Sequence, residues 1–303
     1  MKALVIGYGS AGQRHARILK AIGCDVAIMS GHLEGAFRSI RIALEVSKAE
    51  YAVVASATKF HWNDLRQLAL HRQFDGWRGS ILIEKPVFAD PSHYADDGAD
   101  TKVGYNLRFH PAVRALRERI TDRELYTVQF HVGQWLPDWR PSRDYRQTDV
   151  NGVLRDLSHE LDLMLWLCGW PKVLYALTGK ATGLDIEMED SASILCATER
   201  CPQTVVTMNY IDHSPRRWIH VNYDGGSITA DLVDHVLAEV APDGSQTTRQ
   251  YHVDKDDTYR DMHLAMLNGA DADLLCGLDD GLRVVNLISL IESCQRMPWE
   301  RAA

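Results

Sequence analysis

The 303-residue chain has the composition of an ordinary globular protein, with 46% hydrophobic and 24% charged residues. Its formal net charge of −8 argues against nucleic acid or an anionic membrane as the main partner. No apolar run approaches the ~18 residues of a membrane span, and the N-terminus lacks the pattern of a secretory signal. We therefore expect a cytoplasmic protein of about two domains. The six cysteines form no Cys-x-x-Cys pair or zinc-like group, so we expect free thiols and no metal site.

A glycine-rich segment follows the first expected strand, Lys2–Ile6, and opens a helix-like run to about Ile22. In the dinucleotide-binding form of this motif, the glycines permit a tight turn, admit the pyrophosphate and pack the helix against the strand. The helix N-terminus offers free N–H groups and a positive dipole end to the phosphates. We predict that a dinucleotide binds at Gly7, Gly9, Ser10, Ala11 and Gly12.

Strands and helices alternate through the first hundred residues. Expected strands are Asp25–Met29, Tyr51–Ser56, Ile81–Glu84 and Thr101–Tyr105, and expected helices are Ile40–Ser47 and His61–His71. This alternation predicts an α/β fold with a doubly wound parallel sheet. The link from Met29 to Ile40 is too short for a full helix, so the second crossover is expected to be shortened.

The end of the second expected strand indicates which dinucleotide is bound. A carboxylate there would hold the ribose 2′-hydroxyl of NAD, but this chain has Met29-Ser30-Gly31-His32. We therefore favour NADP(H), with Ser30 as a donor and Arg38 or Arg41 as the counter-charge, while NAD stays open. The hypothesis is that NADP(H) is accepted at least as well as NAD(H).

Two further segments lie at the carboxyl ends of expected strands, which face the ligand crevice of a parallel sheet. Small residues at Ala57-Thr58 let the backbone pass close to a cofactor, and His61 either binds it or only begins the next helix. Ser80–Pro86 runs from three apolar residues into Glu84 and Lys85, whose charges resist burial. A lysine there can act as an acid or base once burial lowers its pKa. The alternative is a solvated strand end before a turn proline, with a cis bond at Pro86 also considered.

From Leu125 the pattern changes to alternating, half-buried strands. They are expected at Tyr126–Gln134, Leu174–Thr182, Ser191–Cys196, Gln203–Tyr210, Trp218–Tyr223, Ser227–Asp231 and Val236–Val240. With Gly-containing turns after Tyr223 and Ala241, they predict a meander-like antiparallel sheet. Two core helices follow, at Tyr259–Leu267 and Leu282–Ile291. The predicted domains are a dinucleotide-binding domain, 1–105, and a substrate-binding domain, 106–303.

The segment Trp135–Arg146 holds two tryptophans, a tyrosine and three arginines spaced by three. Aromatic faces stack on sugar rings, and arginine forks clamp phosphate or carboxylate. The alternative is a solvated loop whose own residues make cation–π contacts. We take Trp135, Arg140 and Arg143 as candidate substrate contacts.

Several of these segments resemble the Gfo/Idh/MocA family of NAD(P)-dependent oxidoreductases. The carriers are Gly7–Gly12 extended by Gln13-Arg14-His15, Ala57-Thr58 with His61, Glu84-Lys85-Pro86, and Gly104–Pro111. A later run, Asp156-Leu157-Ser158-His159-Glu160-Leu161-Asp162, resembles the family's catalytic histidine segment.

The resemblance implies a Rossmann domain followed by an α+β domain with a large, mostly antiparallel open sheet. That sheet often forms a dimer interface, so we expect a homodimer or homotetramer. The family's lysine and histidine flank the reacting carbon, and the matching residues are Lys85 and His159. The family's aspartate lies four residues before the histidine, where this chain has Arg155; Asp156 lies three before, and both spacings share a helix face with His159.

The tryptophan- and arginine-rich segment resembles a branch of the family associated with bacterial surface-sugar and nonulosonic-acid pathways. This implies an anionic sugar substrate, such as a nucleotide sugar, a sugar phosphate or a sugar acid. We expect hydride transfer between a sugar carbinol carbon and the nicotinamide, with Asp156 orienting His159 or binding a substrate hydroxyl. Candidate substrate-binding residues are Asn106, Arg108, Trp135, Arg140, Arg143 and Asp162, and Glu84 joins the cofactor-binding set.

Two other functions stay open at this point. One is a non-catalytic dinucleotide-binding regulator, against which the presence of both Lys85 and His159 argues. The other is an NAD-dependent glycosidase or lyase that uses transient oxidation, which net accumulation of reduced cofactor would exclude.

Overall fold

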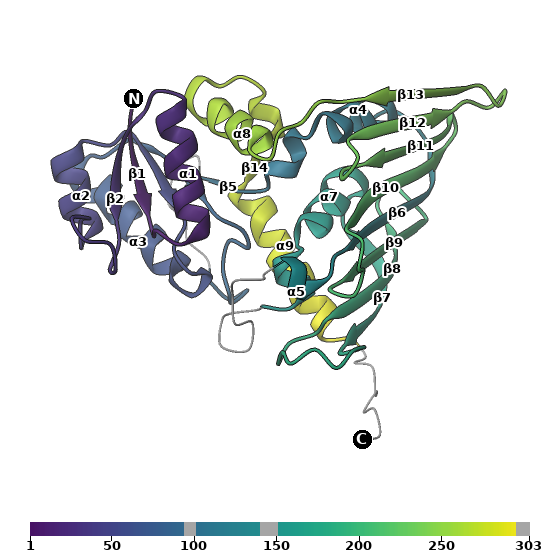
Figure 1. Ribbon diagram of the computed structural model, residues 1–303, viewed down its shortest axis with the longest axis horizontal. Helices are drawn as coiled ribbons and strands as arrows, with labels where there is room; N and C mark the ends of the chain where they lie inside the picture. The colour runs from purple at the N-terminus through teal and green to yellow at the C-terminus, as the bar shows by residue number, and fades with distance from the viewer. Residues whose placement is uncertain (94–100, 140–150, 295–303) are drawn as a thin grey trace. The chain divides into compact units, whose positions relative to one another are not determined.

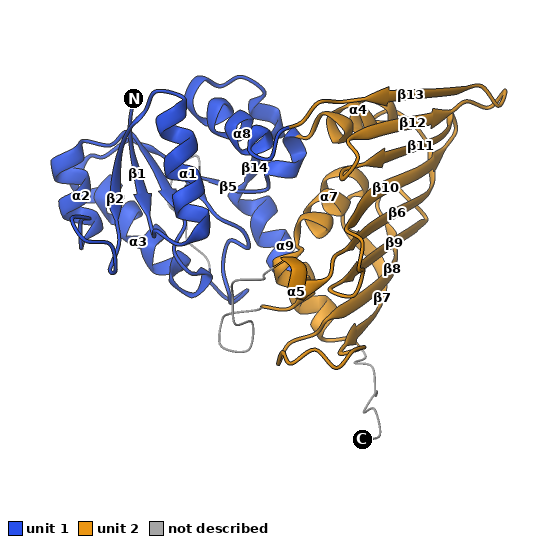
Figure 2. Cartoon of the chain, viewed as in Figure 1, with its two compact units in different colours: residues 1–109, 254–286 blue, residues 110–253, 287–303 orange. Residues whose placement is uncertain are grey.

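The computed structural model describes residues 1–93, 101–139 and 151–294 (Figure 1). The chain divides into two compact units, Met1–Phe109 with Asp254–Asn286, and His110–Val253 with Leu287–Ala303 (Figure 2). The chain first passes from one unit to the other after Phe109, close to the expected domain boundary at residue 105. The structure differs from the expectation that 106–303 forms one domain, because residues 254–286 return to the first unit.

The first unit is built on a six-stranded sheet with the order β14-β5-β4-β3-β1-β2. The parallel strands are β1 (Lys2–Ile6), β2 (Asp25–Met29), β3 (Tyr51–Val54), β4 (Ser80–Ile83) and β5 (Thr101–Val103). Its helices are α1 (Ser10–Ala21), α2 (Ile40–Ser47), α3 (Thr58–Asp75) and α8 (Asp257–Asn268), with the 3-10 turns η1 (Asn106–Phe109) and η2 (Ala272–Leu274). β3 is buried along its whole length, as expected of a strand covered on both faces. The predicted doubly wound sheet is confirmed.

The segment 254–286 belongs to this unit because of two pairings that the sequence pattern does not reveal. The two-residue strand β14 (Cys276–Gly277) adds antiparallel to β5, and α8 packs against η1 and α1. A strand of two residues carries no periodicity, so its place in the first sheet depends entirely on long-range contacts.

The strand order reverses at β1, whose neighbours are β2 on one side and β3 on the other. In open parallel sheets, ligands bind beyond the carboxyl ends of the strands at such a switch point. The link after β2 contains no helix, and Phe37 returns to form an isolated parallel bridge with Met29. The predicted shortening of the second crossover is therefore confirmed.

The second unit is built on an eight-stranded sheet with the order β13-β12-β11-β10-β6-β9-β8-β7. The strands are β6 (Leu125–Gly133), β7 (Pro171–Gly179), β8 (Ser191–Thr198), β9 (Gln203–Asn209), β10 (Arg216–Tyr223), β11 (Gly226–Asp231), β12 (Val236–Val240) and β13 (Gln246–Gln250). All neighbouring pairs are antiparallel except β6 and β9. The predicted sheet is confirmed, while β13 was not predicted because its sequence, Gln-Thr-Thr-Arg-Gln, has no apolar alternation.

Helices cover one face of this sheet. α4 (Pro111–Ile120) packs against β11 and β12, α6 (Val153–Asp156) against β8 and β9, and α7 (His159–Cys168) against β6. The remaining helices are α5 (Leu136–Trp139) and α9 (Leu278–Glu292). Several apolar side chains on the edge strand β7 and its neighbour β8 are exposed, with Tyr175 at 68%. No helix in the described part of the chain is long and apolar enough to cross a membrane.

Candidate active site

Two glycines bring the loop after β1 into close contact with its neighbours. Gly7 has φ +93°, and a Cβ there would lie 2.5 Å from the backbone nitrogen of Ser56, directly after β3. A Cβ on Gly12 would lie 2.2 Å from the carbonyl oxygen of Gly7. These distances leave no room for a side chain, so both glycines are required by the packing of the loop itself.

Gly9 differs from these two glycines. It is the N-cap of α1, it is exposed, and a Cβ built on it would meet nothing within 4 Å. The protein's own packing therefore does not require glycine at this position. The open space adjoins the first turn of α1, which begins with Ser10 and Ala11. This arrangement fits the pyrophosphate of a dinucleotide, which needs close backbone approach and a helix N-terminus.

The residues after β2 fold into a compact turn around Ser30. The Ser30 hydroxyl accepts long hydrogen bonds from the backbone nitrogens of His32 and Leu33, each 3.3 Å, and Arg38 donates to the Ser30 carbonyl over 2.9 Å. Arg41, the other candidate counter-charge, pairs with Glu45 on the surface of α2. Arg38 is therefore the arginine that the structure brings to the end of β2.

His61 lies at a junction between two loops. Ala57 is the N-cap of α3 and Thr58 its first residue, while the buried His61 ring points back to the backbone. Its two nitrogens lie 2.9 Å from the Ser56 carbonyl oxygen and 3.1 Å from that of Val87. Burial lowers the pKa of His61 despite these two acceptors. The ring connects the loop after β3 with the segment after Lys85-Pro86.

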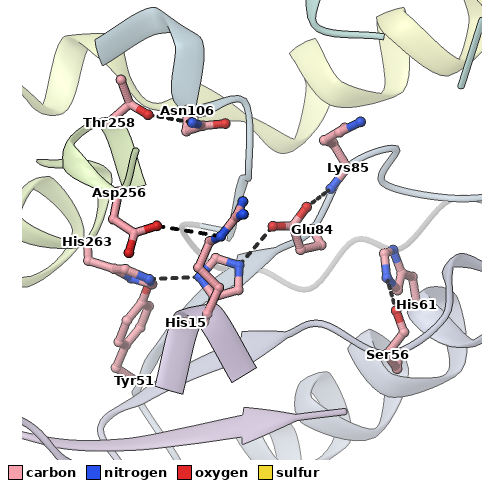
Figure 3. A network of polar contacts seen from close by, with 11 residues as sticks. His15, Tyr51, Ser56, His61, Glu84, Lys85, Asn106, Asp256, Thr258 and His263 are labelled. Atoms are coloured by element: carbon pink, nitrogen blue, oxygen red, sulfur yellow. Dashed lines mark hydrogen bonds and ion pairs between the residues drawn. The ribbon is translucent and has the colours of Figure 1, made fainter. Parts of the chain in front are cut away.

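Glu84 is the buried end of the Ser80–Pro86 segment. One carboxylate oxygen lies 2.8 Å from Nε2 of His15 on α1, and the other accepts the Lys85 N–H over 3.0 Å (Figure 3). Burial is the largest influence and would raise the pKa of Glu84, but the hydrogen bond and charge of His15 together with Lys85 outweigh it, and the pKa is lowered. Lys85 is half-buried, and the Lys85-Pro86 bond is cis, as considered from the sequence. These hydrogen bonds fix the Glu84-Lys85-Pro86 corner, so it is not a solvated strand end.

The segment after β5 supplies two of the candidate substrate residues. Asn106 donates to the Thr258 hydroxyl over 2.6 Å, while its own Oδ1 is buried and has no hydrogen-bond partner among the described residues. The buried guanidinium of Arg108 lies 3.6 Å from Asp280 on α9, so it has a carboxylate partner within its own unit. Of Asn106 and Arg108, Asn106 is the residue with an acceptor atom, Oδ1, that a ligand could use.

In the second unit, His159 is the buried first residue of α7, and Asp156 ends the short helix before it. Tyr210, at the end of β9, donates to Asp156 over 2.8 Å, and Asn151 donates over a longer 3.4 Å. Arg155 forms a two-pronged ion pair with Glu292. Burial disfavours the charged guanidinium, but Glu292 offsets this and raises the pKa of Arg155. The residue at the family's aspartate position is thus engaged with Glu292, while Asp156 is held in place by Tyr210.

The remaining candidates are placed as follows. Asp162 is buried on α7, and the Trp135 ring stacks on His213 at a centroid distance of 4.3 Å. Arg140 and Arg143 lie outside the described residues. Sequence reasoning missed the ion pair of buried Glu160 with Arg217, 2.8 Å apart, because the partners are far apart in the chain.

Residues 113–229 match the family model of the GFO/IDH/MocA C-terminal domain. The match lies within the second unit, and the first unit has the doubly wound sheet that the resemblance implies. The second unit therefore contains a GFO/IDH/MocA C-terminal domain, in agreement with the resemblance seen in the sequence. A search of curated protein sequences finds no match.

Solved structures match nearly the whole length of the chain. UDP-N-acetylglucosamine 3-dehydrogenase GnnA from Acidithiobacillus ferrooxidans matches with a TM-score of 0.79 at 20% identity, covering 96% of each chain. The WlbA dehydrogenase from Bordetella pertussis, solved with NADH and UDP-GlcNAcA, matches at 0.74 and 19%, covering 96% of this chain and 95% of that one. An oxidoreductase from Agrobacterium radiobacter, solved with NAD+, L-tartaric acid and magnesium, matches at 0.78 and 15%, covering 97% and 95%. At these identities the matches establish the fold.

Proposed function

We propose that the chain is an NAD(P)-dependent oxidoreductase that transfers a hydride between a nicotinamide and a carbinol or keto carbon of an anionic sugar derivative. The observation that carries this proposal is the glycine loop at the switch point of the first sheet. Gly7 and Gly12 are glycines because of packing, whereas Gly9 leaves an open space at the N-terminus of α1. A dinucleotide pyrophosphate requires such an opening.

The names of the structural neighbours support a nucleotide sugar as the substrate class. GnnA is a UDP-N-acetylglucosamine dehydrogenase, and WlbA was solved with NADH and UDP-GlcNAcA. A nucleotide sugar carries phosphates, so it also fits the arginine-rich segment that contains Arg140 and Arg143. We therefore place nucleotide sugars ahead of sugar phosphates and sugar acids.

Three side chains carry the proton chemistry in this proposal. The bound nicotinamide supplies the hydride donor or acceptor. His159 takes or returns the hydroxyl proton as general base or acid, and Lys85 hydrogen-bonds the same oxygen. Asp156, held by Tyr210, orients His159 or binds a substrate hydroxyl. Acid–base help of this kind is worth about 10²–10⁴ in rate.

Asn106 is the described residue best prepared to accept a hydrogen bond from a ligand. A buried acceptor left without a partner costs about 1–3 kcal/mol, and a ligand N–H or O–H would remove that cost. Trp135 and Asp162 complete the proposed substrate set, and Arg108 contributes through its ion pair with Asp280.

We also propose that NADP(H) binds at least as well as NAD(H), because β2 ends without a carboxylate and Arg38 lies at Ser30. Fluorescence quenching gives the dissociation constants of both reduced dinucleotides. Arg38→Ala should weaken NADPH binding by about 10-fold and NADH binding little, because one lost ionic hydrogen bond is worth ~1.5–3 kcal/mol. Arg41→Ala, on the same surface but paired with Glu45, is the matched control. A clear preference of the wild type for NADH contradicts this assignment.

The activity is tested by incubating the full chain with NAD+ or NADP+ and a panel of UDP-sugars, and following the absorbance of reduced nicotinamide. Net accumulation of reduced cofactor supports the proposal. Bond cleavage in the sugar without net reduction identifies the elimination or hydrolysis alternative. Tight dinucleotide binding without turnover on any anionic sugar identifies a regulatory binding protein.

We further propose a homodimer, or a homotetramer containing it, through the sheet of the second unit. Val173, Tyr175 and Leu177 on β7 and Leu195 on β8 are each at least 46% exposed, and the pairing register places Tyr175 opposite Leu195. Light scattering after size exclusion should show a dimer that Leu195→Glu converts to a monomer. Leu70→Glu, at a similarly exposed position on α3 of the first unit, should leave the dimer intact.

A further inference from the structure

A continuous row of four buried side chains ends at Glu84 (Figure 3). The Tyr51 hydroxyl lies 2.9 Å from Nδ1 of His263, Nε2 of His263 lies 2.8 Å from Nδ1 of His15, and Nε2 of His15 lies 2.8 Å from Glu84. They come from β3, α8, α1 and the end of β4, all within the first unit. Tyr51, His15 and His263 are completely buried, and Glu84 is 9% exposed.

One set of hydrogen-bond directions leaves both histidine rings of the row neutral. Burial raises the pKa of Tyr51 and lowers that of His263, so Tyr51 is a neutral donor and His263 a neutral ring. Glu84, with its lowered pKa, is an ionised acceptor. In this set, Nε2–H of His15 donates to Glu84, Nε2–H of His263 donates to His15, and the Tyr51 hydroxyl donates to His263. Each ring nitrogen in the row then has a hydrogen-bond partner.

The row is joined to Lys85 at its far end. The second Glu84 oxygen accepts the backbone N–H of Lys85, so both oxygens of the carboxylate are fixed. The positive charge of Lys85 also helps to lower the pKa of Glu84. A carboxylate close to an ammonium favours its protonated form.

We propose that His15 and His263 are positioning residues: the row Tyr51–His263–His15 keeps Glu84 ionised and fixed, and Glu84 in turn holds Lys85 in place and keeps its amine protonated. This inference rests on the proposed function only in giving Lys85 a role in turnover. The row acts through Glu84, and none of its side chains needs to touch the substrate.

Other charged and titratable groups lie around the row. The Tyr259 ring meets His15 edge-on at 5.7 Å and carries the Arg14 guanidinium on its face. Arg14 lies 3.6 Å from Asp256. On other sides, Cys24 interacts with Tyr51, and His61 with Glu84. Of the groups around Glu84, His15 donates a hydrogen bond directly to its carboxylate and so controls its charge most strongly.

A purely structural network makes a different prediction from a positioning one. If the row only stabilises the fold, removing the His15 donor lowers the free energy of unfolding and leaves Lys85 unchanged. If the row positions Lys85, the buried carboxylate without its donor takes up a proton more readily, since burial is then opposed by Lys85 and no longer by His15. Loss of that negative charge lowers the pKa of Lys85 by about one unit.

The first experiment measures the protonation of the His15 and His263 ring nitrogens, without substrate or cofactor. Nitrogen-15 NMR of the full chain labelled at histidine should show His15 and His263 as neutral rings protonated at Nε2. Assignment uses His15→Gln and His263→Gln. A protonated Nδ1 on either ring at neutral pH overturns the proposed direction of the row.

The second experiment measures the effect of the row on the Lys85 amine. The pKa of its amine is measured by carbon-13 NMR of the reductively methylated full chain, with the signal assigned by Lys85→Arg. His15→Leu should lower this pKa by about one unit, and His15→Gln, whose amide can still donate to Glu84, should restore most of it. Glu84→Gln removes the charge with little change of shape and should reproduce the shift, which keeps the test informative if His15→Leu does not fold. His71→Gln on the surface of α3 is the matched control and should change nothing.

An unchanged Lys85 pKa in Glu84→Gln, or no difference between His15→Gln and a folded His15→Leu, overturns the proposal. If both shifts appear but no sugar is oxidised or reduced by the wild type, the proposed function fails and the positioning row stands. If turnover is found without the shifts, the proposed function stands and the row is structural only.

Discussion

The candidate residues of the two units differ in how closely their side chains follow the sequence pattern. In the first unit, the Glu84-Lys85-Pro86 corner has the motif residues in the expected places, and Glu84 is fixed by His15. In the second unit, the position expected to hold an aspartate has Arg155, which pairs with Glu292, and the neighbouring Asp156 is held by Tyr210. Spacing alone therefore does not decide which residue is available for chemistry, because long-range partners select it.

The largest expected effect tests whether Lys85 in the first unit and His159 in the second act in one reaction. Lys85→Ala and His159→Ala should each lower kcat by at least ~10², with cofactor affinity nearly unchanged, because each removes a proton donor or acceptor in the transition state. Lys172→Ala on β7 and His71→Ala on α3 are matched surface controls. Near-normal kcat in either site variant on the true substrate would assign the chemistry to one half alone.

Two glycines of the loop after β1, Gly12 and Gly9, allow the packing of the loop and its ligand binding to be tested separately. Gly12→Ala should destabilise the chain by ~1–3 kcal/mol, the usual cost of overpacking, since its Cβ would lie 2.2 Å from the Gly7 carbonyl. Gly9→Val should leave the free energy of unfolding nearly unchanged and weaken dinucleotide binding at least ~10-fold, because the side chain fills the space proposed for the pyrophosphate. Urea unfolding and fluorescence titration measure the two effects. Equal cofactor affinity in Gly9→Val and the wild type contradicts the assignment.

The second unit has a pH dependence of its own at His110. Its Nδ1 accepts the Ala112 N–H at the start of α4, and its Nε2 lies 3.0 Å from His235. Burial, followed by the His235 charge, lowers the pKa of His110 from 6.5 to about 4. The unfolded chain therefore binds this proton first, so the stability is fully present above pH 6.5 and is lost as the pH falls toward 4.

The loss attributable to His110 is about 3 kcal/mol across that window. His110→Asn keeps an acceptor for the helix start but cannot titrate, so its stability should fall less by about this amount. Urea unfolding at several pH values measures the difference, with His220→Asn as the control. Parallel pH profiles of His110→Asn and the wild type would show that this ring does not titrate on unfolding.

The smallest expected effects show which residue, Arg155 or Asp156, has the role of the family's aspartate. Asp156→Asn should lower kcat about 10-fold with little loss of stability, as for a residue that positions an acid–base group. Arg155→Met should destabilise the chain by ~1–3 kcal/mol by leaving Glu292 without its partner, while kcat stays within about 3-fold. The reversed pattern would give Arg155 the role of the family's aspartate.

The sequence was sufficient for most strands of the two sheets and for the local motifs. The glycine loop, the shortened link after β2 and the alternating strands depend on neighbours along the chain, so periodicity and turn residues predict them. Contacts between distant residues could not be predicted in this way. His263 had no evident partner in the sequence, yet it contacts His15, 248 positions away. The return of residues 254–286 to the first unit has the same cause.

The most direct test of the central claim follows the transferred hydrogen itself. The full chain is incubated with a reduced nicotinamide dinucleotide carrying deuterium at the transferred position and with a keto-sugar nucleotide, and the sugar is examined by mass spectrometry. Hydride transfer predicts one deuterium on a sugar carbon of the wild-type product, and none with Lys85→Ala or His159→Ala over the same interval. Deuterium that stays in the dinucleotide while the sugar is converted would contradict the assignment of this chain as a hydride-transferring oxidoreductase.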